Sequence, residues 1–342
     1  MIHNKIVYIM ALFFVILSCS NCSEDDSNGN DPDPDDDNPV TGDYSGTASV
    51  TQGLASTTVD NLFSDGQRVA GVGTVTADDN SVWTVPAEVN YDNSSFPFAP
   101  DLHNTYGTQY ATAAEALASF DDNNIVEVDA DGEVITGYIF ADNYFELYVN
   151  GLPVGKDAVP FTEFNSHIVK FRVSLPFTIA MKLVDWEENL GLGTETNQGS
   201  DYYPGDGGMV AVFKDASQNT IATTGSEWKA QTFYTAPIKD LGCPSESGTT
   251  RSSANCDTDS ENDGSSFYAL HWEIPETWMN EDFDDADWPN ATTYTNETIV
   301  VNNKPSYMSF TDVFDDTEDD AEFIWSTNVI LDNEVIVRYT VE

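Results

Sequence analysis

Acidic residues recur at alternate positions in one short stretch of the second half of the chain. The carboxylates are Asp257, Asp259, Glu261 and Asp263. Oxygen ligands suit Ca²⁺, and Gly264 directly after them permits a sharp turn. The run is not an EF-hand, because the twelfth position counted from Asp259 is Leu270, which is no bidentate glutamate. The spacing predicts a structural calcium site; the alternative is a solvated loop, since composition alone produces acidic runs in a chain with 59 Asp and Glu residues.

Aromatic and polar side chains also gather on the glycine-rich connection that precedes Gly207. They are Trp186, Glu187, Asn189, Asp201, Tyr202, Tyr203 and Asp206. Flat rings cover the apolar faces of a sugar, while carboxylates and amides bond its hydroxyl groups. We therefore predict a glycan-binding site here. The alternative is that Trp186 caps the core and that the tyrosines are ordinary exposed aromatic residues.

Sequence signatures of catalysis are missing. The chain has no GxSxG, HExxH, phosphate-loop or GxGxxG motif, so no organic cofactor is expected. Three histidines are dispersed singletons, at His103, His167 and His271, and a structural role is expected for the two near predicted strands. A glycosidase needs only two carboxylates at a suitable separation, which the many acidic residues neither support nor exclude. The pattern favours binding over catalysis.

The charge of the chain restricts its partners. With 12 Lys and Arg residues against 59 Asp and Glu residues, the formal net charge is −47. This charge opposes contact with nucleic acid or with an anionic membrane surface. An excess of Asp is also typical of proteins that face seawater or high salt, so the charge does not require a cationic ligand.

The N-terminus has the pattern of a secretory leader. Lys5 supplies a positive charge before twelve consecutive apolar residues, 6–17, which are too few for a membrane span. Ile16-Leu17-Ser18-Cys19 resembles the bacterial lipobox, in which the cysteine is lipidated after cleavage. The resemblance implies a signal peptide over residues 1–18 and lipidation of Cys19. Cys22 fits less well because Asn21 precedes it.

An acidic segment follows the predicted lipidation site. Residues 19–43 contain nine acidic residues and three prolines, and they are expected to form an extended, disordered tether. An acidic run at this position resembles the surface-export signal of Bacteroidetes lipoproteins. The resemblance implies an outer-membrane lipoprotein exposed on the cell surface, held to the membrane only through lipid. A periplasmic spacer is the alternative.

Alternating apolar and polar residues predict strands through most of the remaining chain. The clearest alternation lies at Tyr144–Asn150, Ile168–Leu175 and Glu334–Val341. Further strands are predicted at Gly137–Ala141, Phe177–Trp186, Gly208–Lys214, Trp228–Tyr234, Phe267–Ile274, Glu297–Asn302 and Phe323–Leu331. One short helix is predicted within Ala111–Phe120. Without βαβ alternation, an all-β antiparallel sandwich is expected.

Several segments, in a fixed order, resemble motifs of galactose-binding-like jelly-roll domains. They are Ala141–Gly151, Gly207–Ala211, Ser226–Lys229, Phe283–Ala291, Phe323–Ser326 and Val335–Arg338. The resemblance implies a jelly roll over residues 135–342. Residues 44–134 match less well, and they form either its first strands or a small β module.

One segment departs from the motif pattern. Residues 241–266 are rich in Asp and Ser and are expected to be an insertion, in which Cys243 and Cys256 form a disulfide if the protein is exported. Together these features predict a surface-tethered lipoprotein that binds glycan or polysaccharide. The alternatives are a structural or adhesive protein that binds a protein partner, and an accessory glycoside hydrolase.

Overall fold

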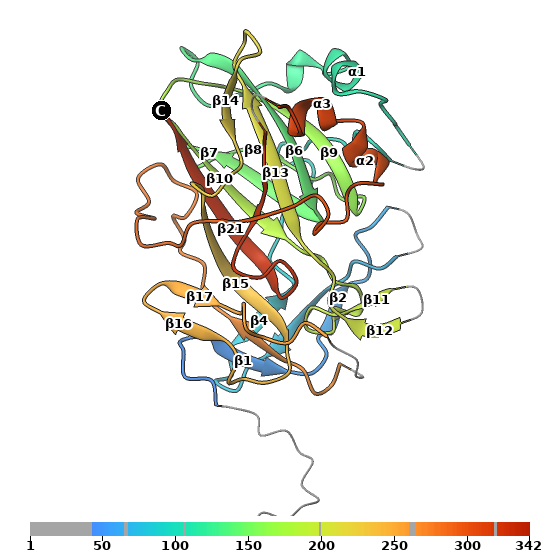
Figure 1. Ribbon diagram of the computed structural model, residues 1–342, viewed down its shortest axis with the longest axis vertical. Coiled ribbons are helices and arrows are strands. Elements are labelled where there is room, and N and C mark those ends of the chain that lie inside the picture. The colour runs from blue at the N-terminus through green and yellow to red at the C-terminus, as the bar shows by residue number, and fades with distance from the viewer. Residues whose placement is uncertain (1–42, 65–67, 105–106, 198–199, 260–263, 318–319) are drawn as a thin grey trace, which may run out of the picture. The chain divides into compact units, whose positions relative to one another are not determined.

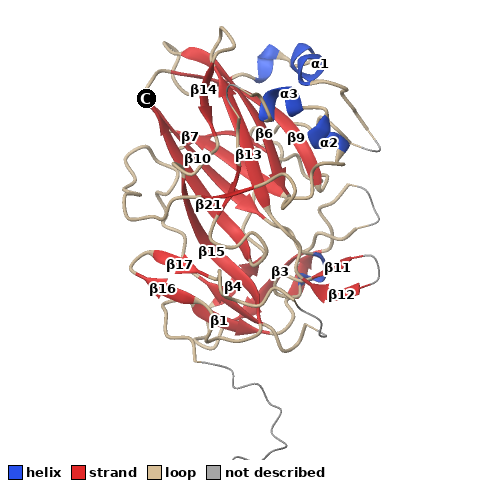
Figure 2. Cartoon of the chain, in the orientation of Figure 1, coloured by secondary structure: helices blue, strands red, loops and turns tan. Residues whose placement is uncertain are grey.

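The computed structural model describes residues 43–64, 68–104, 107–197, 200–259, 264–317 and 320–342. Two large β-sheets of seven strands each form the framework of this part of the chain (Figures 1 and 2). The first sheet has the strand order β1 (Ser49–Gln52), β18 (Tyr268–His271), β15 (Lys229–Ile238), β21 (Asp332–Val341), β10 (Phe177–Val184), β7 (Tyr144–Val149) and β8 (Leu152–Lys156). All pairs in it are antiparallel.

The second sheet is antiparallel except at one edge. Its strand order is β19 (Thr292–Tyr294), β20 (Phe323–Trp325), β13 (Gly208–Lys214), β6 (Glu133–Asp142), β9 (Phe164–Val173) and β5 (Val126–Glu127), with β14 (Thr220–Thr223) also paired to β13. Only the short β5 pairs in parallel, with β9, among the described strands. The expectation of an all-β antiparallel sandwich is confirmed.

Smaller elements complete the described chain. A three-stranded sheet contains β2 (Ser56–Val59), β3 (Val72–Thr76) and β4 (Val82–Val85). Two hairpins pair β11 (Glu195–Asn197) with β12 (Ser200–Tyr203) and β16 (Ser245–Ser247) with β17 (Thr250–Ser252). Residues 44–134 therefore supply β1 and β5 to the two large sheets and β2–β4 to a sheet of their own.

The helices are short. They are α1 (Ala113–Ala118), α2 (Pro305–Met308) and α3 (Thr311–Phe314), with 3₁₀ turns at Asp122–Asn124 and Glu188–Leu190. The predicted helix is α1, which begins where the Thr112 side chain accepts a hydrogen bond from the Glu115 backbone N–H. The expectation of one helix was too low, because α2 and α3 are too short for helical periodicity to reveal them.

The main hydrophobic core lies between the two large sheets. Ile139 and Val210 of the second sheet belong to the same buried cluster as Leu147, Ile179 and Val337 of the first sheet, and all five are fully buried. Burial of such side chains is the main stabilising term in a sandwich, about 1.5–3 kcal/mol for each large aliphatic residue. The core fixes the strand ends that carry the polar clusters described below.

One predicted strand is wrong. Glu297–Asn302 forms turns, although its alternation of buried residues is as expected, with Ile299 and Val301 packed in the main core. Val300 between them has a positive φ of 56° and is exposed. Alternate burial therefore occurs here without a neighbouring strand to pair with.

Candidate functional site

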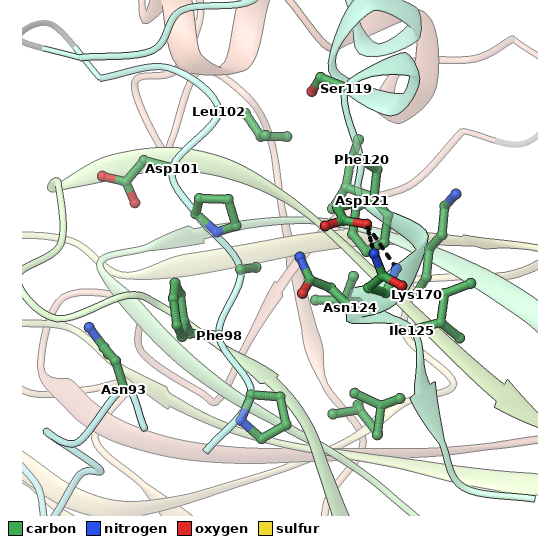
Figure 3. Close-up of a pocket in the computed structure, with 18 of the residues that line it drawn as sticks. Asn93, Phe98, Asp101, Leu102, Ser119, Phe120, Asp121, Asn124, Ile125 and Lys170 are labelled. Atoms are coloured by element: carbon green, nitrogen blue, oxygen red, sulfur yellow. Dashed lines mark hydrogen bonds between the residues drawn. The ribbon is translucent and has the colours of Figure 1, made fainter. Parts of the chain in front are cut away.

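A pocket of about 690 Å³ lies over β8 and β9. Residues 93–102 form one wall, and residues 119–126 form another. Val154 of β8 and Val169 of β9 contribute apolar lining. Figure 3 shows Phe98 on one side of this space and Asn124 with Ile125 on the other. The pocket is thus assembled from segments that are far apart in the sequence.

Aromatic rings and polar groups share the pocket lining. Phe98 is 47% exposed, which is unusual for so large an apolar side chain and leaves its ring accessible. The Lys170 ammonium lies 4.7 Å from the centre of the Phe120 ring and 3.1 Å from Asp122 Oδ1. With the exposed Asn124 amide, the lining offers both ring faces and hydrogen-bonding groups.

Backbone hydrogen bonds hold the first wall in place. The Ala99 N–H donates to the Lys156 carbonyl over 2.8 Å. The buried Asn165 side chain accepts from the backbone N–H groups of Leu102 and His103 through Oδ1, at 3.0 and 2.9 Å. This wall is consequently fastened to the ends of β8 and β9.

Three ionisable side chains meet behind this wall, and we call Asp101, Asp157 and His167 the histidine cluster. One potential metal-binding atom of each lies within 4.8 Å of those of the other two. The Nε2 atom of His167 is 2.6 Å from Asp157 Oδ1, and these side chains are only 2% and 1% exposed. Asp101 also lines the pocket. The cluster therefore connects the buried interior to the pocket wall.

The charges within the histidine cluster compensate one another. Burial disfavours a charged imidazole, but the neighbouring charges of Asp157 and Asp101 outweigh it and raise the pKa of His167. Burial raises the pKa of the Asp101 carboxyl, whereas the charge of His167 opposes that rise. An imidazolium between two carboxylates is the arrangement that lowers the cost of burying each of them.

A second group of acids is buried at the junction of the two sheets. We call Asp142, Asp185, Glu187 and Asp206 the carboxylate cluster. Asp142 ends β6 and pairs in register with Gly208 of β13, two residues after Asp206. The next residue, Asn143, donates its backbone N–H to Val184 of β10, directly before Asp185. The pairing of strands thus brings these separate acids together.

Several oxygen atoms of the carboxylate cluster have no hydrogen-bond donor among the described residues. Asp142 accepts from the Asn143 side chain through Oδ1, and Glu187 accepts from the Gly205 backbone N–H through Oε1. The Oδ2 atoms of Asp142, Asp185 and Asp206 are buried and unpartnered. Unpartnered carboxylate oxygens favour the protonated acid.

The pKa values of the carboxylate cluster follow from burial and like charge. Burial, and then the charges of Asp206 and Asp185, raise the pKa of Asp142 well above its ordinary value. Burial and the charge of Asp185 do the same for Glu187. Burial raises the pKa of Asp206 to about 6, helped by Glu195 and opposed by Lys304. Acids of this kind can exchange protons near neutral pH.

One arginine contacts three acids beside this cluster. Arg68 contacts Glu163, Glu188 and Glu195, at distances of 2.5, 2.7 and 2.8 Å. Glu163 and Glu195 also act electrostatically on members of the carboxylate cluster. The region is therefore an extended acidic network in which only part of the charge is matched by this arginine.

The predicted glycan-binding residues are divided by the structure. Glu187 and Asp206 belong to the carboxylate cluster. Trp186 is only 3% exposed, donates through Nε1 to the Gly71 carbonyl and packs in the core, so the alternative that it caps the core is the one observed. Tyr202 is partly buried against a neighbouring apolar cluster. The side chains of Asn189, Asp201 and Tyr203 lie outside the part of the chain that the structure describes.

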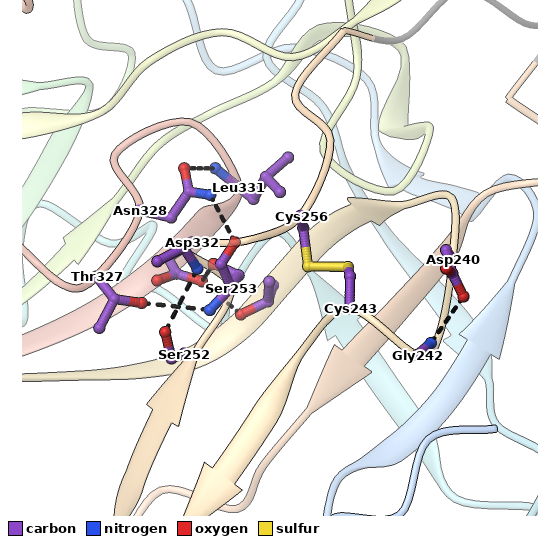
Figure 4. The surroundings of a disulfide bond; sticks show 12 residues. Asp240, Gly242, Cys243, Ser252, Ser253, Cys256, Thr327, Asn328, Leu331 and Asp332 are labelled. Carbon is purple, nitrogen blue, oxygen red and sulfur yellow. Dashed lines mark hydrogen bonds between the residues drawn. A yellow bond between two sulfur atoms is a disulfide. The ribbon is translucent and has the colours of Figure 1, made fainter. Parts of the chain in front are cut away.

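The predicted disulfide is present. Cys243 and Cys256 are bonded and enclose the β16–β17 hairpin, as Figure 4 shows. The hydroxyl of Ser253, inside this loop, donates to Asp332 Oδ1 at the start of β21. The backbone carbonyl of Ser253 accepts from the Asn328 side chain. The insertion is thereby fastened to the first sheet.

The proposed calcium residues follow this disulfide. Asp257 is exposed, and its Oδ2 atom lies 2.8 Å from Lys239 Nζ. Asp259 donates its backbone N–H to Asp257 Oδ1. Glu261 and Asp263 lie outside the described residues, so calcium binding by this loop stays a prediction. The predicted lipidation site at Cys19 and most of the predicted acidic tether also lie outside them.

Sequence reasoning missed the pocket and the histidine cluster. His167 was expected to be a structural histidine, and its neighbours Asp101 and Asp157 are 66 and 10 positions away in the sequence. A usable signal was present in β9, where Asn165, Ser166 and His167 are consecutive polar residues in a strand that is otherwise largely apolar. All three are buried.

Comparisons with protein-family models, curated proteins and solved structures found no match to this chain. Within the described ranges, none of the helices is long and apolar enough to cross a membrane. The pocket and the two buried polar clusters are the features of the described chain that could carry a function.

Proposed function

We propose that this protein is a surface-tethered lipoprotein whose β-sandwich, of the galactose-binding-like jelly-roll type, binds carbohydrate in the pocket over β8 and β9. The observation that carries the proposal is the lining of that pocket. It combines the accessible ring of Phe98 with the exposed amide of Asn124 and a pocket volume of about 690 Å³. Rings that cover sugar C–H groups beside a few placed polar groups are what a saccharide requires.

The pocket replaces the glycine-rich connection as the proposed glycan site. The Trp186 ring is enclosed in the core and has no free face. Phe98, by contrast, keeps almost half of its surface exposed within a concave lining. Lipid attachment at Cys19 and the acidic tether would present this pocket outside the outer membrane. Lipidation and surface exposure are parts of the same proposal.

Binding to a panel of polysaccharides tests the proposed function. The full-length chain, solubilised in detergent, is expected to bind one polymer class saturably. Phe98→Ala is expected to weaken that binding at least tenfold, because the ring supplies the apolar contact. Met308→Ala is the matched control, since Met308 is also 47% exposed but lies on α2 and does not line the pocket.

Two outcomes would contradict the proposal. If no polymer binds, the alternative of a structural or adhesive protein with a protein partner gains support. If a polymer binds and both variants bind it as the wild type does, the binding site lies elsewhere. Surface tethering is tested separately, because Cys19→Ser is expected to abolish lipid labelling and to release the protein from the membrane fraction.

A further inference from the structure

We propose that the histidine cluster is a binding site for a divalent transition-metal ion, with Zn²⁺ as the best-matched probe. The donors are one oxygen each of Asp101 and Asp157 and one ring nitrogen of His167. This inference does not depend on glycan binding in the neighbouring pocket. It uses residues that the sequence motifs do not include.

The three donors converge from separate segments of the chain. Asp101 comes from the pocket wall, Asp157 directly follows β8, and His167 lies in the middle of β9. Their potential ligand atoms nevertheless lie within 4.8 Å of one another. Atoms bound to one ion at about 2.0–2.2 Å lie no more than about 4.4 Å apart, so an ion would need to hold these donors at or slightly inside their present separation.

The two oxygen atoms of each carboxylate have different surroundings. Asp101 Oδ2 accepts a hydrogen bond from the Thr162 hydroxyl, and Asp157 Oδ2 accepts from the Phe145 backbone N–H over 2.9 Å. Asp101 Oδ1 is buried and has no hydrogen-bond donor among the described residues, whereas Asp157 Oδ1 lies 2.6 Å from His167 Nε2. One oxygen of each carboxylate is therefore held by a donor outside the cluster, as is usual for metal ligands.

Asp157 and His167 are in short contact inside the cluster. Asp157 Oδ1 lies 2.6 Å from His167 Nε2, and Asp157 is 1% exposed, so bulk water does not separate the two atoms. An ion bound by both atoms would take the place of the proton between them, because metal ligands must be deprotonated.

The donor set favours a transition metal over calcium. Imidazole nitrogen is a good ligand for Zn²⁺ and its neighbours, whereas Ca²⁺ takes six to eight oxygen ligands. Three protein donors suit a four-coordinate Zn²⁺ ion that keeps one position for water or another ligand. The predicted calcium loop at Asp257 offers only oxygen atoms, so the two proposed sites differ in metal preference.

Titration calorimetry of the full-length chain tests the metal site. Chelator-treated protein at neutral pH is expected to bind one Zn²⁺ ion at micromolar concentration or tighter, and to bind Ca²⁺ at this site at least a hundredfold more weakly. Asp101→Asn is expected to weaken Zn²⁺ binding about a hundredfold, since it removes a charged ligand. Asp92→Asn is the control, because Asp92 is exposed and does not belong to the cluster.

Two further readouts keep the proposal falsifiable. Co²⁺ should give a visible absorption band in the wild type that Asp101→Asn alters. Thr162→Val, which keeps every ligand but removes the hydroxyl that positions Asp101, should weaken Zn²⁺ binding about tenfold. The proposal is overturned if the wild type shows no stoichiometric binding, or if Asp101→Asn and Thr162→Val both bind Zn²⁺ with wild-type affinity.

Discussion

The histidine cluster and the carboxylate cluster both bury carboxylates. Those of the histidine cluster have an imidazole between them, whereas the members of the carboxylate cluster are all acids. In the histidine cluster an imidazole lies between two carboxylates, and its pKa is raised by their charges. In the carboxylate cluster, burial and the charges of Asp206 and Asp185 raise the pKa of Asp142, and burial and the charge of Asp206 raise that of Asp185. Lys304 opposes the rise at Asp142 and Asp206.

The comparison shows that burial alone does not decide what a carboxylate contributes. A buried charge with a partner is tolerated and becomes costly when the partner is lost. A buried charge without a partner is costly already, so its removal is favourable. Mutations in the two clusters should therefore change stability in opposite directions.

The largest effect is expected from His167→Leu. This variant leaves Asp157 buried at 1% exposure without the imidazole beside it. Loss of one partner from a buried pair typically costs about 3–5 kcal/mol. Chemical denaturation should show a decrease of that size in the free energy of unfolding. His103→Leu, at a partly exposed histidine that belongs to neither cluster, should cost far less.

Asp142→Asn is expected to increase the free energy of unfolding, whereas His167→Leu decreases it. The substitution replaces a buried acid, whose ionisation is opposed by burial and by acidic neighbours, with an uncharged amide that keeps an Oδ1 atom able to accept from Asn143. Relief of an unpartnered buried group is worth about 1–3 kcal/mol, so the free energy of unfolding at pH 7 should increase by that amount. A decrease in denaturation experiments would show that the carboxylate cluster is compensated after all.

The pH dependence of Asp206 gives a smaller effect. Its pKa is about 6 in the folded protein and near 3.8 when unfolded, so the folded state binds the proton more tightly. The resulting stability is complete below pH 4 and is lost as the pH rises through 6. Between pH 4 and 7 the free energy of unfolding of the wild type should therefore fall by about 1–2 kcal/mol relative to that of Asp206→Asn. This figure includes a reduction because the Asp206 side chain is partly exposed. Parallel profiles for the two proteins would refute this assignment.

The smallest effect is expected at the exposed acids of the insertion. Asp257→Asn breaks a surface contact with Lys239, so without calcium it should change stability by less than about 0.5 kcal/mol. If the loop binds calcium, Ca²⁺ should raise the melting temperature of the wild type and Asp257→Asn should reduce that rise. An unchanged melt on addition of chelator would remove the calcium site.

The fold was more accessible from the sequence than the sites. Alternation identified strands such as Tyr144–Val149, although both faces of this strand are buried. Asn150 and Gly151 after it have the positive φ angles of a tight hairpin turn. Alternation failed at Glu297–Asn302, where burial has the same period but the segment forms turns and pairs with none of the described strands. A local pattern therefore indicates a candidate strand, whereas its pairing and the burial of its second face depend on the rest of the chain.

The sites depend on contacts that no local pattern contains. Asp101 and His167 meet because the 93–102 wall is fastened across β9, and Asp142 meets Asp206 through the register of β6 and β13. The disulfide could be predicted, since two nearby cysteines in an insertion have few alternatives. Trp186 shows the reverse case, because its polar neighbours suggested a surface site while its ring packs inside.

Glycan binding by variants of the pocket and of the carboxylate cluster tests most directly where the carbohydrate binds. With the polysaccharide that binds the full-length wild type, Phe98→Ala and Asp206→Asn should be measured side by side by calorimetry. The account predicts that Phe98→Ala loses at least tenfold in affinity, whereas Asp206→Asn binds as the wild type does. Loss of binding in Asp206→Asn with full affinity in Phe98→Ala would contradict it, because the ligand would then occupy the carboxylate cluster and not the pocket.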